Sequence, residues 1–390
     1  MNHRRQMIII FNFVMIIAAI TLAIMFGIAG YGRPHGPQDV SLYDFSSYIY
    51  PAGKMWLNGL NPYDGFFPYP PNSALLCMLL SVTDLETSKI LFLGLNVLCI
   101  ILWVYLCIKL YNHQNREKKF FLLDVRLSLL ISMLVGNVFI FNVLWVGQTS
   151  IFIAAALLAS YYFYIRSSEI SSGIFLAFAL NKPQLAYTFF VWLVLEKKWK
   201  TLAASIAATM ILGIVPIYNR GIITTIQDWI NVLNEYIQVV NRICFWNLFG
   251  LQPLFKDFGI QIGSPIIFIC SIFLIIWIHK YYKTTDILKL YGILTIIGLL
   301  LGQASQYDLI IIAPMLAHYV VKISNQDFKK LILLCLTFVI MNFPRSQLLL
   351  SDIRILHHHR VILLIIMLLF LLFWREGQRP RDILLNPGEA

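Results

Sequence analysis

The sequence predicts an all-α polytopic membrane protein, and its composition and charge distribution support that fold class. The chain of 390 residues is 59% hydrophobic and 13% charged, with a mean hydropathy of +0.75. A soluble domain has about 45–50% apolar and about 25% charged residues. Lys and Arg cluster between the apolar runs, as the positive-inside rule expects, and this explains the net charge of +11. Because the basic residues are dispersed along the chain, we expect no nucleic-acid partner.

The first apolar run, Met7–Ile28, follows Arg4 and Arg5 and is long enough to span the hydrocarbon core. We predict an uncleaved signal-anchor with a cytoplasmic N-terminus, since a cleavable signal has a shorter apolar region. Residues 31–71 then form a first extracytoplasmic loop that is rich in Tyr, Pro, Gly, Asp and Asn. A loop of this length exceeds what a turn needs, so it is a candidate place for chemistry.

The remaining membrane segments follow from the later apolar runs. Asn72–Val82 covers only about half a membrane, so whether it spans or re-enters stays open. Gly173–Leu195 is interrupted at Asn181–Gln184 and has basic residues beyond both ends, which predicts two half-helices that enter and return. The other predicted segments are Ile90–Tyr111, Leu127–Val146, Thr149–Ile165, Leu202–Tyr218, Pro265–Ile278, Leu288–Leu301, Leu309–Val321, Leu331–Phe343 and Val361–Trp374. The total is roughly 10–12 membrane segments.

We expect a single integral membrane domain over residues 1–390. A second extracytoplasmic loop is predicted at 219–263 and a cytoplasmic tail at 375–390. No internal repeat is visible, so the inverted-repeat design of many transporters finds no support. The Ile- and Lys-rich composition is compatible with a bacterial plasma membrane.

The cysteine and histidine patterns give no sign of a metal centre. Five of the six cysteines lie in apolar runs, where Cys behaves as a small hydrophobic residue. The run His357–His359 is interpreted as polar residues at the membrane interface, with a metal ligand as the alternative. The chain shows no acidic pair suited to Mg²⁺. We therefore expect no cofactor, and leave dependence on a divalent cation open.

Two ionisable residues are the main candidates for chemistry. Asp44 lies close to the membrane surface in the first loop, where it could act as a general base or, alternatively, cap a helix. Lys182 lies inside an apolar segment beside Pro183, and an ionisable residue there is costly and points to function. A cation at that depth suits the phosphate of a lipid carrier, and the alternative is a lysine that snorkels to the interface.

The other polar candidates gather at predicted extracytoplasmic helix ends. Gln148 could bond a sugar or phosphate, or simply begin a span. Asp308 follows Gln306 and Tyr307 at a helix start, where the helix dipole alone also favours an acid. Aromatic rings of the first loop could stack on sugar faces or form an interfacial belt. We expect the following residues to bind donor or acceptor: Lys182, Gln148, Tyr48, Asn61, Tyr63, Tyr69, Asn181, Asn247, Gln306, Tyr307 and Asp308.

The ordered motifs resemble those of glycosyltransferase family 87. The run Asp44-Phe45-x-x-Tyr48, with Gly59–Tyr63 and Tyr69-Pro70-Pro71, resembles the first outer loop of that family. Later motifs are similar as well, namely Gly147–Ser150, Asn181–Pro183 and Trp246–Gly250. The resemblance covers most of residues 39–310. The family's late His has no counterpart at residues 306–308, where the nearest histidine is His318.

The resemblance implies a GT-C-type membrane glycosyltransferase fold, with short juxtamembrane helices in the first loop. The best-known members are mycobacterial mannosyltransferases that use polyprenyl-phosphate-mannose. By resemblance, the chain is a hexosyltransferase that moves a monosaccharide, with mannose expected, from a polyprenyl-phosphate donor. The acceptor would be a lipid-linked or cell-envelope glycan on the extracytoplasmic face. The implied reaction is inverting, with Asp44 as general base.

Two alternatives stay open at this point. A transporter or flippase for a lipid-linked or polar substrate would need charged residues along a path through the membrane. Apart from Lys182, such charges are few in the predicted spans. A polysaccharide polymerase or an assembly subunit would share the membrane location and differ in its donor or lack one.

Overall fold

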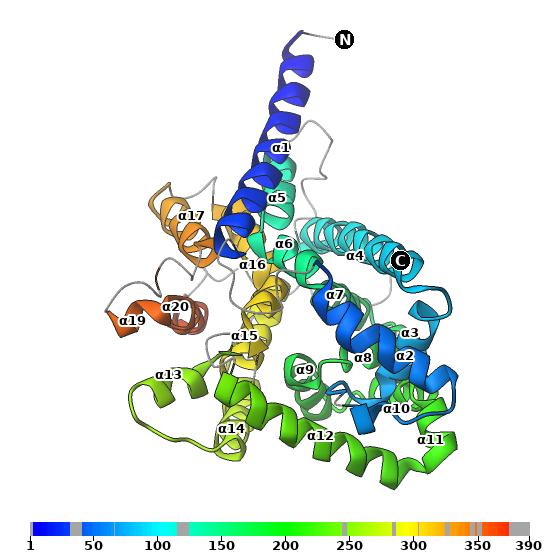
Figure 1. Ribbon diagram of the computed structural model, residues 1–390. Helices are drawn as coiled ribbons and strands as arrows, with labels where there is room; N and C mark the ends of the chain where they lie inside the picture. Colours follow the sequence, from blue (N-terminus) through cyan, green and yellow to red (C-terminus); the bar gives the residue numbers. More distant parts are fainter. Residues whose placement is uncertain are drawn as a thin grey trace.

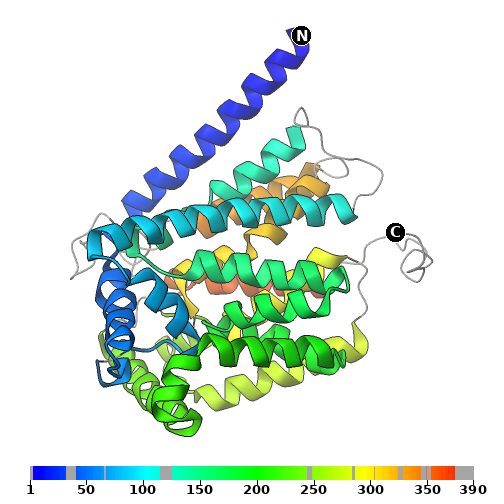
Figure 2. The ribbon, with the colours of Figure 1, turned by 90° about the vertical axis from the view of Figure 1, so that its right-hand side faces the viewer.

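The computed structural model describes residues 3–31, 41–65, 67–114, 125–243, 248–282, 286–302, 304–323, 328–343, 348 and 353–373. Within these residues the chain is almost entirely helical. Most of the long helices run side by side across Figure 2, and the N-terminal helix crosses them obliquely. This arrangement confirms the predicted all-α polytopic architecture.

The helices are, in chain order, α1 (His3–Tyr31), α2 (Tyr50–Leu57), α3 (Ala74–Leu80), α4 (Leu85–Gln114), α5 (Val125–Val135), α6 (Val138–Val146), α7 (Ser150–Ile165), α8 (Glu169–Ala179), α9 (Pro183–Leu195), α10 (Trp199–Leu212), α11 (Ile214–Arg220), α12 (Ile222–Ile243), α13 (Leu251–Asp257), α14 (Ser264–Tyr281), α15 (Ile287–Leu301), α16 (Ala313–Ile323), α17 (Phe328–Asn342), α19 (Arg354–His357) and α20 (His359–Phe373). A π-helical turn covers Phe45–Ile49, and 3₁₀ turns cover Pro62–Gly65, Pro71–Ser73 and Gln306–Ile312.

Among the described residues, four helical segments are long and apolar enough to cross a membrane: Ile9–Ile28, Leu85–His113, Arg126–Val146 and Ser264–Tyr281. Helices α10 and α11 add a fifth if this pair, bent by 65°, is one span. The other apolar helices, such as α7, α9 and α15, have 10–17 residues. A multi-pass membrane protein follows from these segments, whereas the total of 10–12 remains a prediction.

The structure shows how two segments that the sequence left open are built, residues 72–82 and 173–195. Helix α3 has seven residues, and at a rise of 1.5 Å per residue it is about 10 Å long, too short for a core of about 30 Å. Residues 173–195 do divide into two helices, α8 and α9, which meet at Leu180–Lys182. The break occurs where Pro183 begins α9, because proline suits the first turn of a helix and not its interior.

Residues 41–65 and 67–80 form a packed cap and not a loose connector. A hydrophobic cluster beneath them contains Phe45, Trp56, Phe67 and Phe92, all nearly fully buried. The rings of Phe45 and Phe92 stack with centroids 4.6 Å apart. Aromatic pairs of this kind add stability beyond the area that they bury. The cluster therefore fixes the segment that begins at Asp44 against α4.

The second large loop predicted at 219–263 contains a 22-residue helix, α12, which the sequence analysis did not anticipate. Ile222, Ile226 and Ile230 recur every four residues along it, a period that places them on one face of a helix. In Figure 1 α12 runs across the end of the bundle nearest the viewer, and Figure 2 shows it at the same end as α2 and α3. We call this end of the bundle the site end.

A short antiparallel ladder also lies at the site end. Strand β1 (Leu248–Phe249) pairs with β2 (Ala304–Ser305), with Leu248 opposite Ser305 and Phe249 opposite Ala304. The ladder joins the second loop to the turn before Gln306. The side chain of Trp229 on α12 donates from Nε1 to the carbonyl of Pro68 at 3.1 Å. These contacts tie α12 and β1 to the segments that carry the candidate site.

Candidate functional site

The turn between α6 and α7 is the centre of the candidate site. Gly147 ends α6 with φ at +80°, a left-handed conformation that favours glycine. Leu42 packs against this turn and donates its backbone N–H to the carbonyl of Trp145 at 2.6 Å. A Cβ atom at position 147 would lie only 2.9 Å from the Cα of Leu42. Glycine here lets the segment that carries Asp44 approach the turn that carries Gln148.

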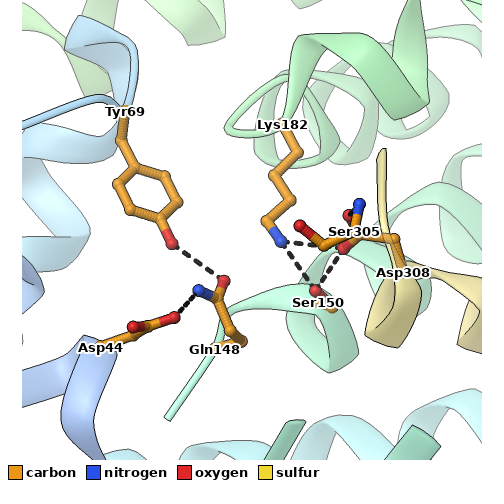
Figure 3. Close-up of polar contacts among 7 residues, drawn as sticks. All are labelled: Asp44, Tyr69, Gln148, Ser150, Lys182, Ser305 and Asp308. Atoms are coloured by element: carbon orange, nitrogen blue, oxygen red, sulfur yellow. Dashed lines mark hydrogen bonds and ion pairs between the residues drawn. The ribbon is translucent and has the colours of Figure 1, made fainter. Parts of the chain in front are cut away.

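Asp44 directly precedes the π-helical turn and bonds to Gln148. Nε2 of Gln148 donates to Oδ2 of Asp44, as Figure 3 shows. Within the described residues, Oδ1 of Asp44 has no hydrogen-bond partner. Burial raises the pKa of Asp44 from 3.8 to about 6, although the Gln148 bond and the charge of Lys182 both act to lower it. The carboxyl is therefore mostly ionised at neutral pH.

Tyr69 completes this first group of side chains. Its hydroxyl donates to Oε1 of Gln148 at 3.0 Å (Figure 3). Burial raises the pKa of Tyr69 well above its usual value, so the phenol stays protonated. The carbonyl of Tyr69 accepts from the hydroxyl of Tyr63 at 3.2 Å. The chain Tyr69–Gln148–Asp44 is thus continuous.

Lys182 forms a second group on the other side of the same turn. Its ammonium donates to Oγ of Ser150 at 2.8 Å and to Oδ1 of Asp308 at 2.9 Å (Figure 3). The side chains of Lys182 and Asp308 are only 6% and 1% exposed, so this is a buried ion pair. The ammonium also lies 4.9 Å from the ring centroid of Tyr307. A snorkelling lysine, the alternative considered from the sequence, does not fit these contacts.

Asp308 is held by backbone as well as by Lys182. Ser305 and Asp308 form a capping box at the start of the 3₁₀ helix, and Oδ2 of Asp308 accepts from the Ser305 N–H at 2.9 Å. Oδ1 accepts a 2.6 Å bond from Ser150. Asp308 therefore both caps the 3₁₀ helix and pairs with Lys182. Gly147–Ser150 positions both groups, through Gln148 on one and Ser150 on the other.

Several predicted binding residues lie outside these two groups. Tyr63 is 5% exposed and packs within the cluster under the cap, and its role in binding donor or acceptor stays a prediction. Asn61 donates to Asp64 at 2.8 Å and to Asp228 at 3.4 Å, as a turn residue does. Tyr48 is half-buried and makes an edge contact with the ring of Tyr43.

The remaining predicted binding residues are Gln306, Asn181 and Asn247, and each has a different outcome. Gln306 accepts a 2.5 Å bond from Arg360 of α20. Asn181 donates from Nδ2 to the carbonyl of Phe178 at 2.9 Å, and its Oδ1 is buried with no partner among the described residues. Asn247 lies outside the described residues.

Several residues at the site end carry little signal in the sequence. Ser150 lies in the Gly147–Ser150 motif, which predicts no role for it, and Ser305 and Trp229 carry no pattern that marks them. Arg360 did have a signal, because it stands at the start of an apolar helix, where an ionisable residue points to function. Arg360 is 5% exposed and also donates to the carbonyls of Met341 and Phe343.

The described residues contain no group of three or more His, Cys, Asp or Glu side chains that could hold a metal ion. His358, from the histidine run, instead pairs with Asp257 at 2.8 Å. His318 is buried beside Asp286, with Nε2 and Oδ2 3.7 Å apart. It therefore does not stand in for the histidine missing at 306–308.

The fold and the site define a polytopic helical membrane protein with two buried polar groups at one end of its bundle. The chain belongs to glycosyltransferase family 87, whose model matches residues 66–277, more than half of the chain. A search of curated proteins and a search of solved structures each gave no match. The protein is therefore a membrane glycosyltransferase. Tyr69, Gln148 and Lys182 lie within the matched stretch, Asp44 before it and Asp308 after it.

Proposed function

We propose that the protein transfers a monosaccharide, with mannose expected, from a polyprenyl-phosphate donor to a lipid-linked or cell-envelope glycan acceptor, with inversion at the anomeric carbon. The observation that carries this proposal is Asp44, a half-buried carboxylate at the site end with one oxygen bonded to Gln148 and the other without a described partner. Mannose and the lipid carrier rest on the resemblance to known members of the family.

In the proposed reaction, Asp44 is the general base. Its Oδ1 accepts the proton of the acceptor hydroxyl as that oxygen bonds to the anomeric carbon. The bond between that carbon and the phosphate oxygen breaks, and its electron pair stays on the lipid phosphate. A base works best with a pKa near the operating pH, and the pKa of about 6 places Asp44 close to that range. One displacement of this kind inverts the configuration.

Lys182 would bind the leaving phosphate. An ammonium has three N–H donors, and two of them are used by Ser150 and Asp308. Ser150 is the first residue of α7, and Lys182 directly precedes α9, so the N-termini of both helices meet at the Lys182–Ser150 bond. Helix N-termini favour anions. The third N–H and these two helix ends together make a suitable place for a phosphate.

Two buried polar atoms beside this place suit the hydroxyl groups of a sugar. Oδ1 of Asn181 and Oγ1 of Thr149 are buried, and neither has a partner within the described part of the chain. A buried acceptor without a hydrogen bond costs about 1–3 kcal/mol, and a bound sugar hydroxyl would remove that cost. We propose no metal step, because a polyprenyl phosphate is already a reasonable leaving group.

The charge distribution supports the proposed orientation. The ends of the helices opposite the site end carry Arg166, Lys197, Lys198, Lys200 and Lys280. By the positive-inside rule this end is cytoplasmic, so the site end faces the extracytoplasmic side. A bacterial plasma membrane would hold both the lipid donor and the glycan acceptor.

The rival transporter is less well supported. A second ion pair joins Asp286 and Lys322 at 2.8 Å near the far end of α15. Between it and the site lies the buried and largely apolar run Ile293–Leu300. A path for a polar substrate or ion would need polar groups along this stretch.

The test is a transfer assay on the purified protein in lipid, with a panel of polyprenyl-phosphate monosaccharides and membrane-extract acceptors. We expect product from one donor with wild type and none with Asp44→Asn. Asp64→Asn is the matched control, because Asp64 is an exposed carboxylate in the same cap. Full activity of Asp44→Asn would refute the base. Lipid flipping without turnover of any donor would favour the transporter, and neither activity would favour an assembly subunit.

A further inference from the structure

The carboxamide of Gln148 bridges Asp44, which accepts a hydrogen bond, and Tyr69, which donates one. Asp44 as a carboxylate can only accept hydrogen bonds, and the protonated Tyr69 hydroxyl donates to Oε1 of Gln148. Only one orientation of the amide serves both partners, with Nε2 toward Asp44 and Oε1 toward Tyr69. In the reverse orientation, an amide oxygen would face the carboxylate.

We propose that Tyr69 and Gln148 are positioning residues that hold the Asp44 carboxylate so that Oδ1 faces the acceptor. Tyr69 fixes the orientation of the Gln148 amide, and Gln148 holds Oδ2 of Asp44. This inference rests on the proposed function for its catalytic consequence. It gives both residues a role different from direct contact with donor or acceptor.

The backbone that carries Tyr69 is itself held from two sides. The Tyr63 hydroxyl donates to the carbonyl of Tyr69 at 3.2 Å, and Trp229 of α12 donates to the carbonyl of Pro68 at 3.1 Å. The buried aromatic cluster under the cap surrounds Tyr63. Tyr63, whose ring could from the sequence have stacked on a sugar or joined an interfacial belt, would thus serve the base by keeping Tyr69 in place.

Removal of the Tyr69 hydroxyl would free the amide to rotate and weaken the bond to Asp44. That bond lowers the pKa of Asp44, so its loss would raise the pKa further above 6. The other titratable groups that act on Asp44 are Lys182, which lowers its pKa, and the half-buried phenols Tyr69 and Tyr307. Both phenols are neutral, since burial keeps them protonated. Among these titratable groups, Lys182 therefore supplies the charge that acts on the pKa of Asp44.

The experiment compares Tyr69→Phe and Gln148→Met with wild type in the lipid-reconstituted full chain. Tyr50→Phe is the matched control, because Tyr50 lies in the same cap and its hydroxyl donates to the Thr83 carbonyl at 3.1 Å. We expect Tyr69→Phe to lower kcat about tenfold with little change in KM for the donor. The reason is that it weakens the bond from Gln148 to the charged Asp44, and loss of a hydrogen bond to a charged group has about this effect. The acid limb of the pH profile should move up by about one pH unit. Tyr50→Phe should change neither.

A double variant separates positioning from general damage. If Tyr69 acts through Gln148, Tyr69→Phe added to Gln148→Met should cause no further loss of kcat. Fully additive losses would overturn the inference, as would an unchanged kcat and acid limb in Tyr69→Phe.

A second readout needs no turnover. Carbodiimide labels protonated carboxyl groups, so labelling of Asp44 against pH, read by mass spectrometry, reports its titration in each variant. A midpoint that shifts upward in Tyr69→Phe supports the positioning role even if no donor is ever transferred, in which case only the proposed function fails. An unchanged midpoint overturns the inference whether or not the protein is active.

Discussion

The buried pair of Lys182 and Asp308 allows a test that separates a structural role from a chemical one. The change is Asp308→Asn or Lys182→Met alone, and then both together. Each single variant leaves one charge in a place where the two side chains are only 6% and 1% exposed. Removal of one partner from a buried ion pair costs about 3–5 kcal/mol, mostly because the remaining charge is uncompensated.

The double variant should recover most of that loss. An asparagine side chain in place of Asp308 can still accept from the Ser305 N–H, as Asp308 does at 2.9 Å, so the helix cap survives while both charges disappear. We expect the double variant to lie within about 1–2 kcal/mol of wild type, since an ion pair of this kind contributes little against a neutral replacement. It should nonetheless lose transfer activity, because no ammonium remains for the leaving phosphate.

The assay is thermal unfolding of the purified protein at one fixed scan rate, because large proteins often unfold irreversibly. Each single variant should lower the midpoint by roughly 5–10 °C, given how midpoint shifts scale with stability in large chains. Arg220→Met is the control, since Arg220 pairs with Asp228 at 3.3 Å with its side chain 38% exposed, where a pair contributes about 0–1 kcal/mol. Additive losses in the double variant would refute the reasoning, and so would a fully active double variant.

Three further predictions concern Asp44 and the turn that holds it. Transfer activity should rise with pH through about 6 as Asp44 ionises, measured as kcat against pH, and a flat profile between pH 5 and 7 would argue against the base. The same raised pKa means that the folded state binds this proton more tightly than the unfolded chain. Its contribution to stability is therefore present below about pH 4 and is lost as the pH rises through about 6, which urea unfolding at several pH values can measure. Gly147→Ala should reduce activity strongly, because its Cβ would meet the Cα of Leu42 at 2.9 Å and displace Asp44. Gly221→Ala is the matched control, since Gly221 has a similar φ of +78° and nothing within 4 Å of the added Cβ, so it should lose stability and keep activity.

The fold class was predictable from the sequence because membrane helices follow from local hydropathy. Even the break at Pro183 was visible, since proline acts on its own helix. Helix α12 was missed because its polar residues interrupt the apolar run, although its period of Ile222, Ile226 and Ile230 is also local. The β1–β2 ladder could not be predicted, because two residues per strand carry no periodic signal.

The candidate residues were predictable one by one, and their partners were not. Asp44 and Gln148 are 104 residues apart in the chain, and Lys182 and Asp308 are 126 apart. The order of the motifs along the chain assigns such residues to one family, but it does not predict which side chains are in contact. Tyr63 shows the limit most clearly, because a tyrosine in an outer loop looks the same in sequence whether its ring is exposed or packed in a cluster.

The pairing of Lys182 also changes the reasoning about its charge. The sequence presents a lone cation inside the membrane that needs an anionic ligand. In the folded protein Asp308 already balances that charge at 2.9 Å, so an incoming phosphodiester adds a net negative charge to a neutral pair. Under the proposed function, the charge on that phosphate grows from one to two as the sugar departs. Lys182 and the N-termini of α7 and α9 would then interact more strongly with the transition state than with the bound donor. This difference accelerates the reaction, and Asp308 weakens the attraction of Lys182 for the bound donor and, in proportion, for the transition state.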